Sequence, residues 1–219
     1  MTRIRVLCYN MRAFRDDVPA LIDVVRGIEP DLVFVQETPR FIRWRSRSAG
    51  LAAACGLVVV PGGGAPACGN MLMVRPAVAV DRARPMRFPH TIGEQPRGGA
   101  VAKLSLNGTR FTAAGVHLGH PRHERLRHAE YLLQELSDPD PLLVAGDFNE
   151  DFNAPESKPL HDVLTATLRD VAGEDRHNTF SAKTLVVAST AFLWIHGLTL
   201  CTTALCITIS PCVRAITCR

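Results

Sequence analysis

The sequence predicts an α+β fold in which two β-sheets pack together and helices cover them on the outside. The first observation is the order of the elements: strands and helices alternate near the start, several strands including a hairpin follow, and helix, strand and helix come next. The second is composition, because 47% hydrophobic and 21% charged residues are ordinary for a globular protein. A chain of 219 residues is long enough to bury the core of one domain.

The first elements are two buried strands separated by a helix. Residues 4–10 (IRVLCYN) are apolar and end in polar residues, which predicts a strand with Asn10 at its end. Asp17 can cap the helix that follows, because its side chain can accept a backbone hydrogen bond. Residues 32–35 predict the second strand, and Gln36 and Glu37 lie at its end.

The next stretch predicts one helix and a series of strands. Residues 40–56 look helical after Pro39, and we interpret the arginines Arg40, Arg43, Arg45 and Arg47 as a solvated face. Short apolar runs at 57–60, 70–74 and 77–80 predict strands. Residues 98–119 alternate as in a β-hairpin, with Asn107 and Gly108 at the turn, since both tolerate positive φ.

The last elements of the charged part of the chain are helix, strand and helix. Leucines and alanines at helical spacing predict a helix over 122–136. The run LLVAGDFN, residues 142–149, predicts a strand, and a further helix is expected over 158–168.

Polar side chains recur where apolar strands stop, and they are Asn10, Glu37, His117, Asp147 and Asn149. Residues at strand ends can converge on one face although they are distant in sequence. A Glu and an Asp brought together there repel each other unless a cation lies between them, and oxygen ligands suit Mg²⁺ or Mn²⁺. An amide can donate to a phosphate oxygen, and a histidine can donate a proton or stabilise developing charge.

Each of these residues also has a purely structural explanation when it is taken alone. A Glu after a strand can cap a helix, GDFN can be a turn, and a single His can complete a local hydrogen-bond network. A zinc site is another alternative, since His117, His120 and His123 are spaced by three. However, Gly119 and Pro121 interrupt any helix that could place the three on one side.

In combination the motifs resemble the endonuclease/exonuclease/phosphatase family, the relatives of DNase I and exonuclease III. The motifs are YNM near the start, PDLVFVQE, RGGAVAKL leading to GVHLGH, and LLVAGDFN, in that order over about residues 3–183. The resemblance implies a four-layer α/β sandwich with two mixed β-sheets flanked by helices. It also implies a metal-dependent phosphodiesterase or phosphatase.

The resemblance assigns a role to each of the residues at the strand ends. Glu37 looks like the main metal ligand, with Asn10 beside it, and the ion implied is Mg²⁺ or Mn²⁺. Asp147 would orient the attacking water, Asn149 would hold the phosphate, and His117 would stabilise the transition state or the leaving group. A further pair, Thr179 and Phe180, resembles the TF that the family often places before its last strands.

The composition changes abruptly at Lys183, which divides the chain into a domain over 1–183 and a tail over 184–219. All 21 acidic residues precede the break, and the tail keeps only two of the 25 basic residues, Arg214 and Arg219. Four of the seven cysteines lie in the tail. The other three, Cys8, Cys55 and Cys68, are scattered, which favours reduced thiols over a disulfide framework.

The tail lacks two motifs that the resemblance leads us to expect, a strand reading about R-I-D-x-I-F-V and a terminal S-D-H. The bases that encode residues 184–194 can, in the neighbouring frame, read His-Pro-Arg-Arg-Arg-Ile-Asp-Arg-Ile-Phe-Val, and those for 213–219 can read Arg-Ala-Ser-Asp-His-Leu-Pro. We therefore hypothesise that one nucleotide is missing just after the Lys183 codon. The chain as written is then expected to lack its final strands and its activity.

The alternative is that the tail is real and tethers a non-catalytic protein to a membrane, because roughly 20 apolar residues span a bilayer. We disfavour it, since residues 184–209 are Thr-rich and would replace the catalytic end of an enzyme. The N-terminus has no apolar run of signal-peptide length, so a cytoplasmic protein is expected. The expected partner is a phosphodiester substrate, with DNA, RNA, phosphoinositide and sphingomyelin all open, and no obligate protein partner is evident.

Overall fold

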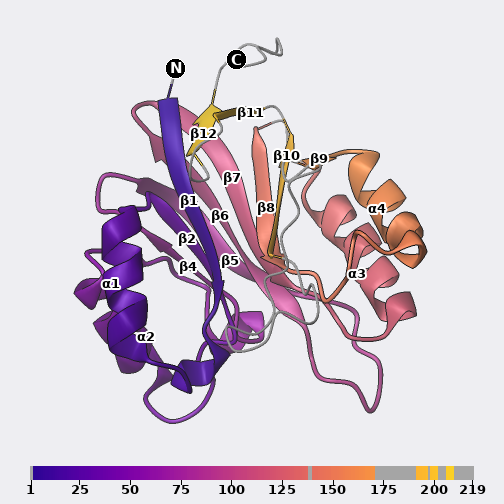
Figure 1. The fold of residues 1–219 in the computed structure, drawn as a ribbon, viewed down its shortest axis with the longest axis horizontal. Helices are drawn as coiled ribbons and strands as arrows, with labels where there is room; N and C mark the ends of the chain where they lie inside the picture. The colour runs from indigo at the N-terminus through magenta and orange to yellow at the C-terminus, as the bar shows by residue number, and fades with distance from the viewer. Residues whose placement is uncertain (1, 138–139, 171–190, 197, 202–205, 210–219) are drawn as a thin grey trace.

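The computed structural model describes residues 2–137, 140–170, 191–196, 198–201 and 206–209, and it has two mixed β-sheets (Figure 1). In order across the first sheet, the strands are β11 (Leu198–Cys201), β12 (Cys206–Ile209), β1 (Thr2–Asn10), β2 (Leu32–Gln36), β4 (Met71–Val74) and β3 (Val58–Val59). The second sheet has the order β5 (Ala79–Arg87), β6 (Gly98–Leu106), β7 (Thr109–His117), β8 (Leu142–Asp147), β10 (Ala191–His196) and β9 (Arg169–Asp170). Strands β1 and β2 are parallel, as are β7 and β8, and the other paired strands are antiparallel.

Helices cover the outer faces of both sheets, which makes four layers (Figure 1). Helices α1 (Val18–Ile28) and α2 (Trp44–Ala54) pack on the first sheet, and α3 (Arg122–Glu135) and α4 (Lys158–Thr165) pack on the second. Short 3₁₀ helices are η1 (Arg12–Phe14), η2 (Ala65–Ala67) and η3 (Pro155–Ser157). The predicted cap is present, because the Asp17 side chain accepts a 3.0 Å hydrogen bond from the backbone N–H of Ala20.

The two sheets face each other across an apolar core. Phe34 and Leu72 of the first sheet pack in one cluster with Ala113 and other buried residues of the second. Gly115 lies where the sheets pack closely, because a Cβ atom there would be 3.0 Å from Leu72 Cδ2 and 3.1 Å from Phe34 Cδ1. The four-layer sandwich with two mixed sheets that the sequence predicted is therefore confirmed.

Two predicted boundaries differ from those in the structure. Helix α2 begins at Trp44 rather than after Pro39, because Arg43 has a left-handed φ of 58° that cannot belong to an α-helix. Phe41 and Ile42 precede it and are 81% and 87% exposed. Strand β5 is longer than expected from the run at 77–80, and Pro85 fits within it because β5 is the edge strand of its sheet.

The sequence predicted that the final strands are lost, and the structure shows that this prediction is wrong. Strand β10 pairs with β8 and β9, and β12 pairs with β1, so segments of the tail complete both sheets. Backbone hydrogen bonds do not depend on particular side chains, and the β-branched and aromatic residues of the tail favour strands. Residues of the tail thus occupy strand positions in both sheets, whichever reading frame the tail comes from.

Some expectations concern residues that the structure does not describe, namely Thr179, Phe180 and the Lys183 boundary. The cysteines that precede the tail, Cys8, Cys55 and Cys68, are free thiols, as expected. In the described parts of the chain, no helix has the length and apolar character needed to span a bilayer.

Candidate active site

The polar residues singled out in the sequence lie at the ends of four strands, and the sheet packing brings these ends together. Asn10 ends β1, Glu37 follows β2, His117 ends β7 and Asp147 ends β8. Within the second sheet, His117 and Asp147 are paired residues of the parallel strands β7 and β8. Parallel strands place their carboxyl ends at the same edge, so the two side chains share one edge of the sheet.

Asn10 joins the carboxylates of the two sheets. Its Nδ2 donates to Glu37 Oε1 at 3.0 Å and to Asp147 Oδ2 at 3.1 Å, although Asp147 is 137 residues away in the sequence. Its Oδ1 accepts a hydrogen bond from the backbone N–H of Arg12 at 3.1 Å. One neutral amide therefore holds two acidic side chains close to each other.

This arrangement fits a hard divalent cation. Two carboxylates that lie close together repel each other, and here the amide N–H groups of Asn10 lie between them. A positive charge at the same place would be stabilised by both carboxylates. The carboxylate oxygens are ligands that Mg²⁺ or Mn²⁺ prefers, and the Asn10 amide oxygen, which now accepts from the Arg12 backbone, would join them after rotation of the amide. The residues present are thus compatible with the ion that the sequence predicted.

The zinc alternative gains no support. Over the residues that the structure describes, no three His, Cys, Asp or Glu side chains cluster so as to hold a metal ion. His117 is 3% exposed, whereas His120 and His123 are exposed on the loop and at the start of α3.

His117 is a buried, neutral imidazole. The guanidinium Nη1 of Arg97 lies 2.9 Å from its Nε2 and 3.2 Å from its Nδ1, and Asp147 Oδ2 lies 3.7 Å from Nε2. Burial and, next in importance, the positive charge of Arg97 lower the pKa of His117 to about 3. At neutral pH this ring can donate and accept hydrogen bonds but carries no charge.

The loops after β7 and β8 are tied together around Asn149. The backbone N–H of Asn149 donates to Asp147 Oδ1 at 3.0 Å, and its side-chain Nδ2 donates to the carbonyl oxygen of Leu118 at 2.9 Å. The backbone N–H of Leu118 donates in turn to the Asp147 carbonyl at 2.9 Å. Asn149 has a φ of 50°, which Asn tolerates better than most residues. The GDFN motif is therefore a turn that orients Asp147.

A buried ion pair supports these loops from α3. Arg125 Nε and Nη2 lie 2.9 and 2.8 Å from Glu150 Oε2, and Arg125 Nη1 also donates to the carbonyl oxygen of His120. Both side chains are less than a tenth exposed. Arg125 thereby connects the loop that follows His117 to the loop that follows Asp147.

Arg97 is a residue of this site that the sequence reasoning missed. Arg97 is 9% exposed, and its guanidinium contacts the His117 ring. The register of the β6–β7 hairpin could have identified Arg97 from the sequence. With Asn107 and Gly108 at the turn, the register pairs Gly98 with His117, so Arg97 must enter the hairpin beside the end of β7.

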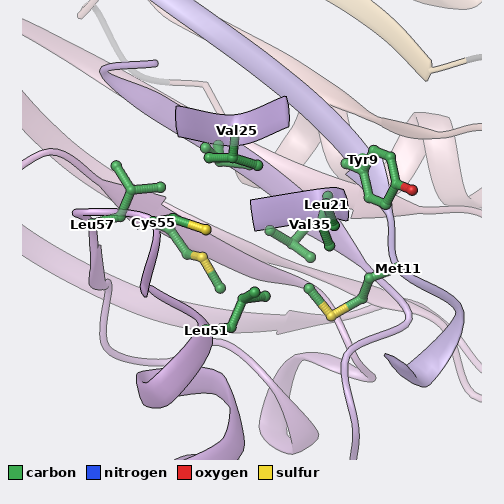
Figure 2. Close-up of a pocket in the computed structure, with 10 residues that line it drawn as sticks. Tyr9, Met11, Leu21, Val25, Val35, Leu51, Cys55 and Leu57 are labelled. Atoms are coloured by element: carbon green, nitrogen blue, oxygen red, sulfur yellow. The ribbon is translucent and has the colours of Figure 1, made fainter. Parts of the chain in front are cut away.

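The cavity drawn in Figure 2 is a different feature. It lies between the first sheet and helices α1 and α2, has a volume of about 10 Å³, and is lined by apolar side chains such as Leu21, Val25 and Leu51 with Tyr9 and Cys55. None of the polar residues at the strand ends lines it. We interpret it as a packing gap of the helix–sheet core.

Comparison with known families gives one match over most of the chain. The model of the Endonuclease/Exonuclease/phosphatase family matches residues 7–214, a range that includes β10, β11 and β12. None of the curated protein sequences matches this chain significantly.

Solved structures of several proteins share the fold. TDP2 from D. rerio, complexed with single strand DNA product, superposes with a TM-score of 0.70 at 17% identity, and the match covers 89% of this chain and 84% of that one. An endonuclease/exonuclease/phosphatase family protein from Bacteroides thetaiotaomicron has a TM-score of 0.71 at 17% identity, over 89% and 83%. A mannosyl-6-phosphatase from the same organism has a TM-score of 0.68 at 15% identity, over 88% and 85%.

Proposed function

The chain belongs to the endonuclease/exonuclease/phosphatase family of hydrolases, and we propose from this membership that its site is built for Mg²⁺-dependent hydrolysis of a phosphoester or phosphodiester. Members of the family are generally dependent on a divalent metal. The observation that carries the proposal is the Asn10 amide between the carboxylates of Glu37 and Asp147, which brings oxygen donors from both sheets to one point.

In this proposal Glu37 and Asn10 hold the metal ion. Glu37 is exposed at the end of β2, so its carboxylate is open to an ion from solvent. Mg²⁺ or Mn²⁺, when bound, would act as a Lewis acid toward a phosphoryl oxygen.

The other residues act on water and on the phosphoryl group. Asp147 would align an attacking water, and the hydrogen bonds that it accepts from Asn10 and from the backbone of Asn149 support this role because they restrict its orientation. The Asn149 side chain would hold a phosphate oxygen, and its bond to Leu118 sets where that amide lies. His117 stabilises the transition state or the leaving group as a neutral hydrogen-bonding ring.

The tail determines whether this chain is active, and we propose that it is read out of frame after Lys183. The support comes from the register: Ala191, the first residue of β10, pairs with Asp147, and the alternative frame reads an Asp at the preceding position, 190. An Asp there would enter the strand beside the site. As written, the chain has neither that Asp nor the terminal S-D-H, and loss of a catalytic base costs a factor of about 10² to 10⁴.

The second candidate function is a non-catalytic protein whose segment 184–209, which lacks acidic and basic residues, binds a membrane; it would require β10 and β12 to leave the sheets in which they pair with β8 and β1. Resequencing the gene across the Lys183 codon separates the two. An additional base supports the hydrolase, and confirmation of the present frame makes membrane fractionation of the expressed chain the deciding test.

The substrate proposed is a phosphodiester, with a nucleic acid as the first candidate. Arg40 lies near enough to the site to act electrostatically on His117 and Arg97, and Arg43, Arg45 and Arg47 continue from it. An affinity for single-stranded DNA that falls steeply with salt would support this choice.

The test of the hydrolase uses the chain in both frames. The frame-restored chain should hydrolyse bis(4-nitrophenyl) phosphate when Mg²⁺ is present, the chain as written should be slower by at least about 10²-fold, and Glu37→Ala should remove the Mg²⁺-dependent activity. The exposed Glu130→Ala on α3 is the matched control and should keep it. Full Mg²⁺-dependent activity in Glu37→Ala would show that the metal assignment is wrong.

A further inference from the structure

Arg97 brings a buried positive charge to the site. The residue is 9% exposed, and burial lowers the pKa of its guanidinium. Among the residues that the structure describes, its hydrogen-bond partner is the His117 ring, and no carboxylate lies within ion-pair distance of it. A buried charge whose direct partner is neutral is costly unless another group of opposite charge completes the site.

The position of Arg97 is fixed by the surrounding backbone. The backbone N–H of Phe88 donates to its carbonyl oxygen at 3.1 Å, and Asn70 Nδ2 donates to the carbonyl of the next residue, Gly98, at 2.9 Å. Gly98 has no room for a side chain, because a Cβ atom would overlap the Met86 carbonyl oxygen. Arg97 is thus anchored at its main chain and, through His117, at its guanidinium.

The charge of Arg97 is directed toward the acidic residues of the site. His117 Nε2 lies 2.9 Å from Arg97 Nη1 and 3.7 Å from Asp147 Oδ2, so the guanidinium lies near the carboxylates that Asn10 joins. A guanidinium has five N–H donors, and only those of Nη1 are used on His117. The remaining donors match the oxygen atoms of a phosphoryl group, which Arg can bind in a two-pronged manner.

We propose that Arg97, whose guanidinium lies against the His117 ring, binds a non-bridging oxygen of the phosphoryl group and supplies a positive charge to this site. This inference rests on the proposed function and adds a residue to it. Fixed positive charge beside a transferring phosphoryl group favours the charge that develops there.

The experiment measures binding of inorganic phosphate to the full chain, with and without Mg²⁺, by isothermal titration calorimetry. Arg97→Gln should weaken phosphate binding by about 10- to 100-fold, as expected for a lost hydrogen bond between charged groups, and Arg97→Lys should recover part of it. The exposed Arg82→Gln on β5 has the same change in net charge and should bind as the wild type does. Circular dichroism verifies that each variant is folded.

A second readout does not depend on the folding of any variant. Phosphate added to the wild-type chain should shift the NMR signal of the Arg97 side-chain Nε–H. An unshifted Arg97 signal, a wild-type chain that does not bind phosphate, unchanged affinity in folded Arg97→Gln, or an equal loss in Arg82→Gln would each overturn the proposal.

An assay of hydrolysis distinguishes a failure of this inference from a failure of the proposed function. Mg²⁺-dependent cleavage by the frame-restored chain together with phosphate binding that does not require Arg97 refutes the role of Arg97 and leaves the function standing. The reverse result, Arg97-dependent phosphate binding without cleavage, keeps Arg97 as an anion-binding residue and refutes the hydrolase.

Discussion

Acidification should destabilise this fold through His117. The ordinary pKa of 6.5 falls to about 3 in the folded protein, because the ring is buried and faces the Arg97 guanidinium. Between these values the unfolded chain binds a proton that the folded chain does not bind, so stability is complete above pH 6.5 and is lost as the pH falls toward 3. At about pH 5 the loss from this one group is about 2 kcal/mol.

The assay is urea unfolding of the wild type and of His117→Asn at a series of pH values from about 8 to about 5. The difference in unfolding free energy between the two proteins isolates His117, because titration of other groups is common to both. This difference should change by about 2 kcal/mol, with the wild type losing more on acidification. The exposed His123→Asn serves as the control for loss of a histidine at the surface.

Two results would refute the reasoning. A difference that stays constant with pH would mean that His117 binds protons equally in both states, and a wild type that gains stability on acidification would mean that the imidazolium is favoured in the fold. In either case Arg97 could not lie against the ring with its charge intact.

Other predictions concern the supports of the site. Arg125→Met should cost about 3–5 kcal/mol in urea unfolding, because it breaks the buried ion pair between Arg125 and Glu150, and adding Glu150→Gln should recover part of this loss. Gly146→Ala should cost about 3 kcal/mol, since the new Cβ would overlap the Val116 carbonyl oxygen; a melting temperature equal to that of the wild type would contradict this. Burial raises the pKa of the Cys8 thiol to about 12, so mass spectrometry should find Cys8 alkylated at about pH 8 only after denaturation.

Much of the fold was determined by local sequence patterns. Strands such as 32–36 and the hairpin at 98–117 are apolar or alternating runs with clear turn residues, and Asp17 is a cap that acts within its own helix. Such signals depend on neighbours in the chain, so they can be read without knowing what packs against them. The start of α2 was misplaced because the left-handed turn at Arg43 has no marker residue of its own.

The residues of the candidate site were also visible in the sequence, because each one ends an apolar strand. The contacts between these residues could not be predicted from the sequence. Asn10 meets Asp147 only because the two sheets face each other, and Arg97 meets His117 only through the register of β6 and β7. Distances between residues that are remote in the chain are set by packing of the core, as the Gly115 contact between the sheets shows.

In the tail too, some features follow from residue identity and others follow from how the sheets pack. Its sequence determined a loss of charge and of the expected R-I-D and S-D-H motifs, since these depend on residue identity. That β10 pairs with β8 and β12 pairs with β1 was decided by the open edges of the folded sheets. Backbone pairing accepts almost any β-forming segment, whereas catalysis requires particular side chains at particular positions, and so a fold can be completed by a segment that does not restore its chemistry.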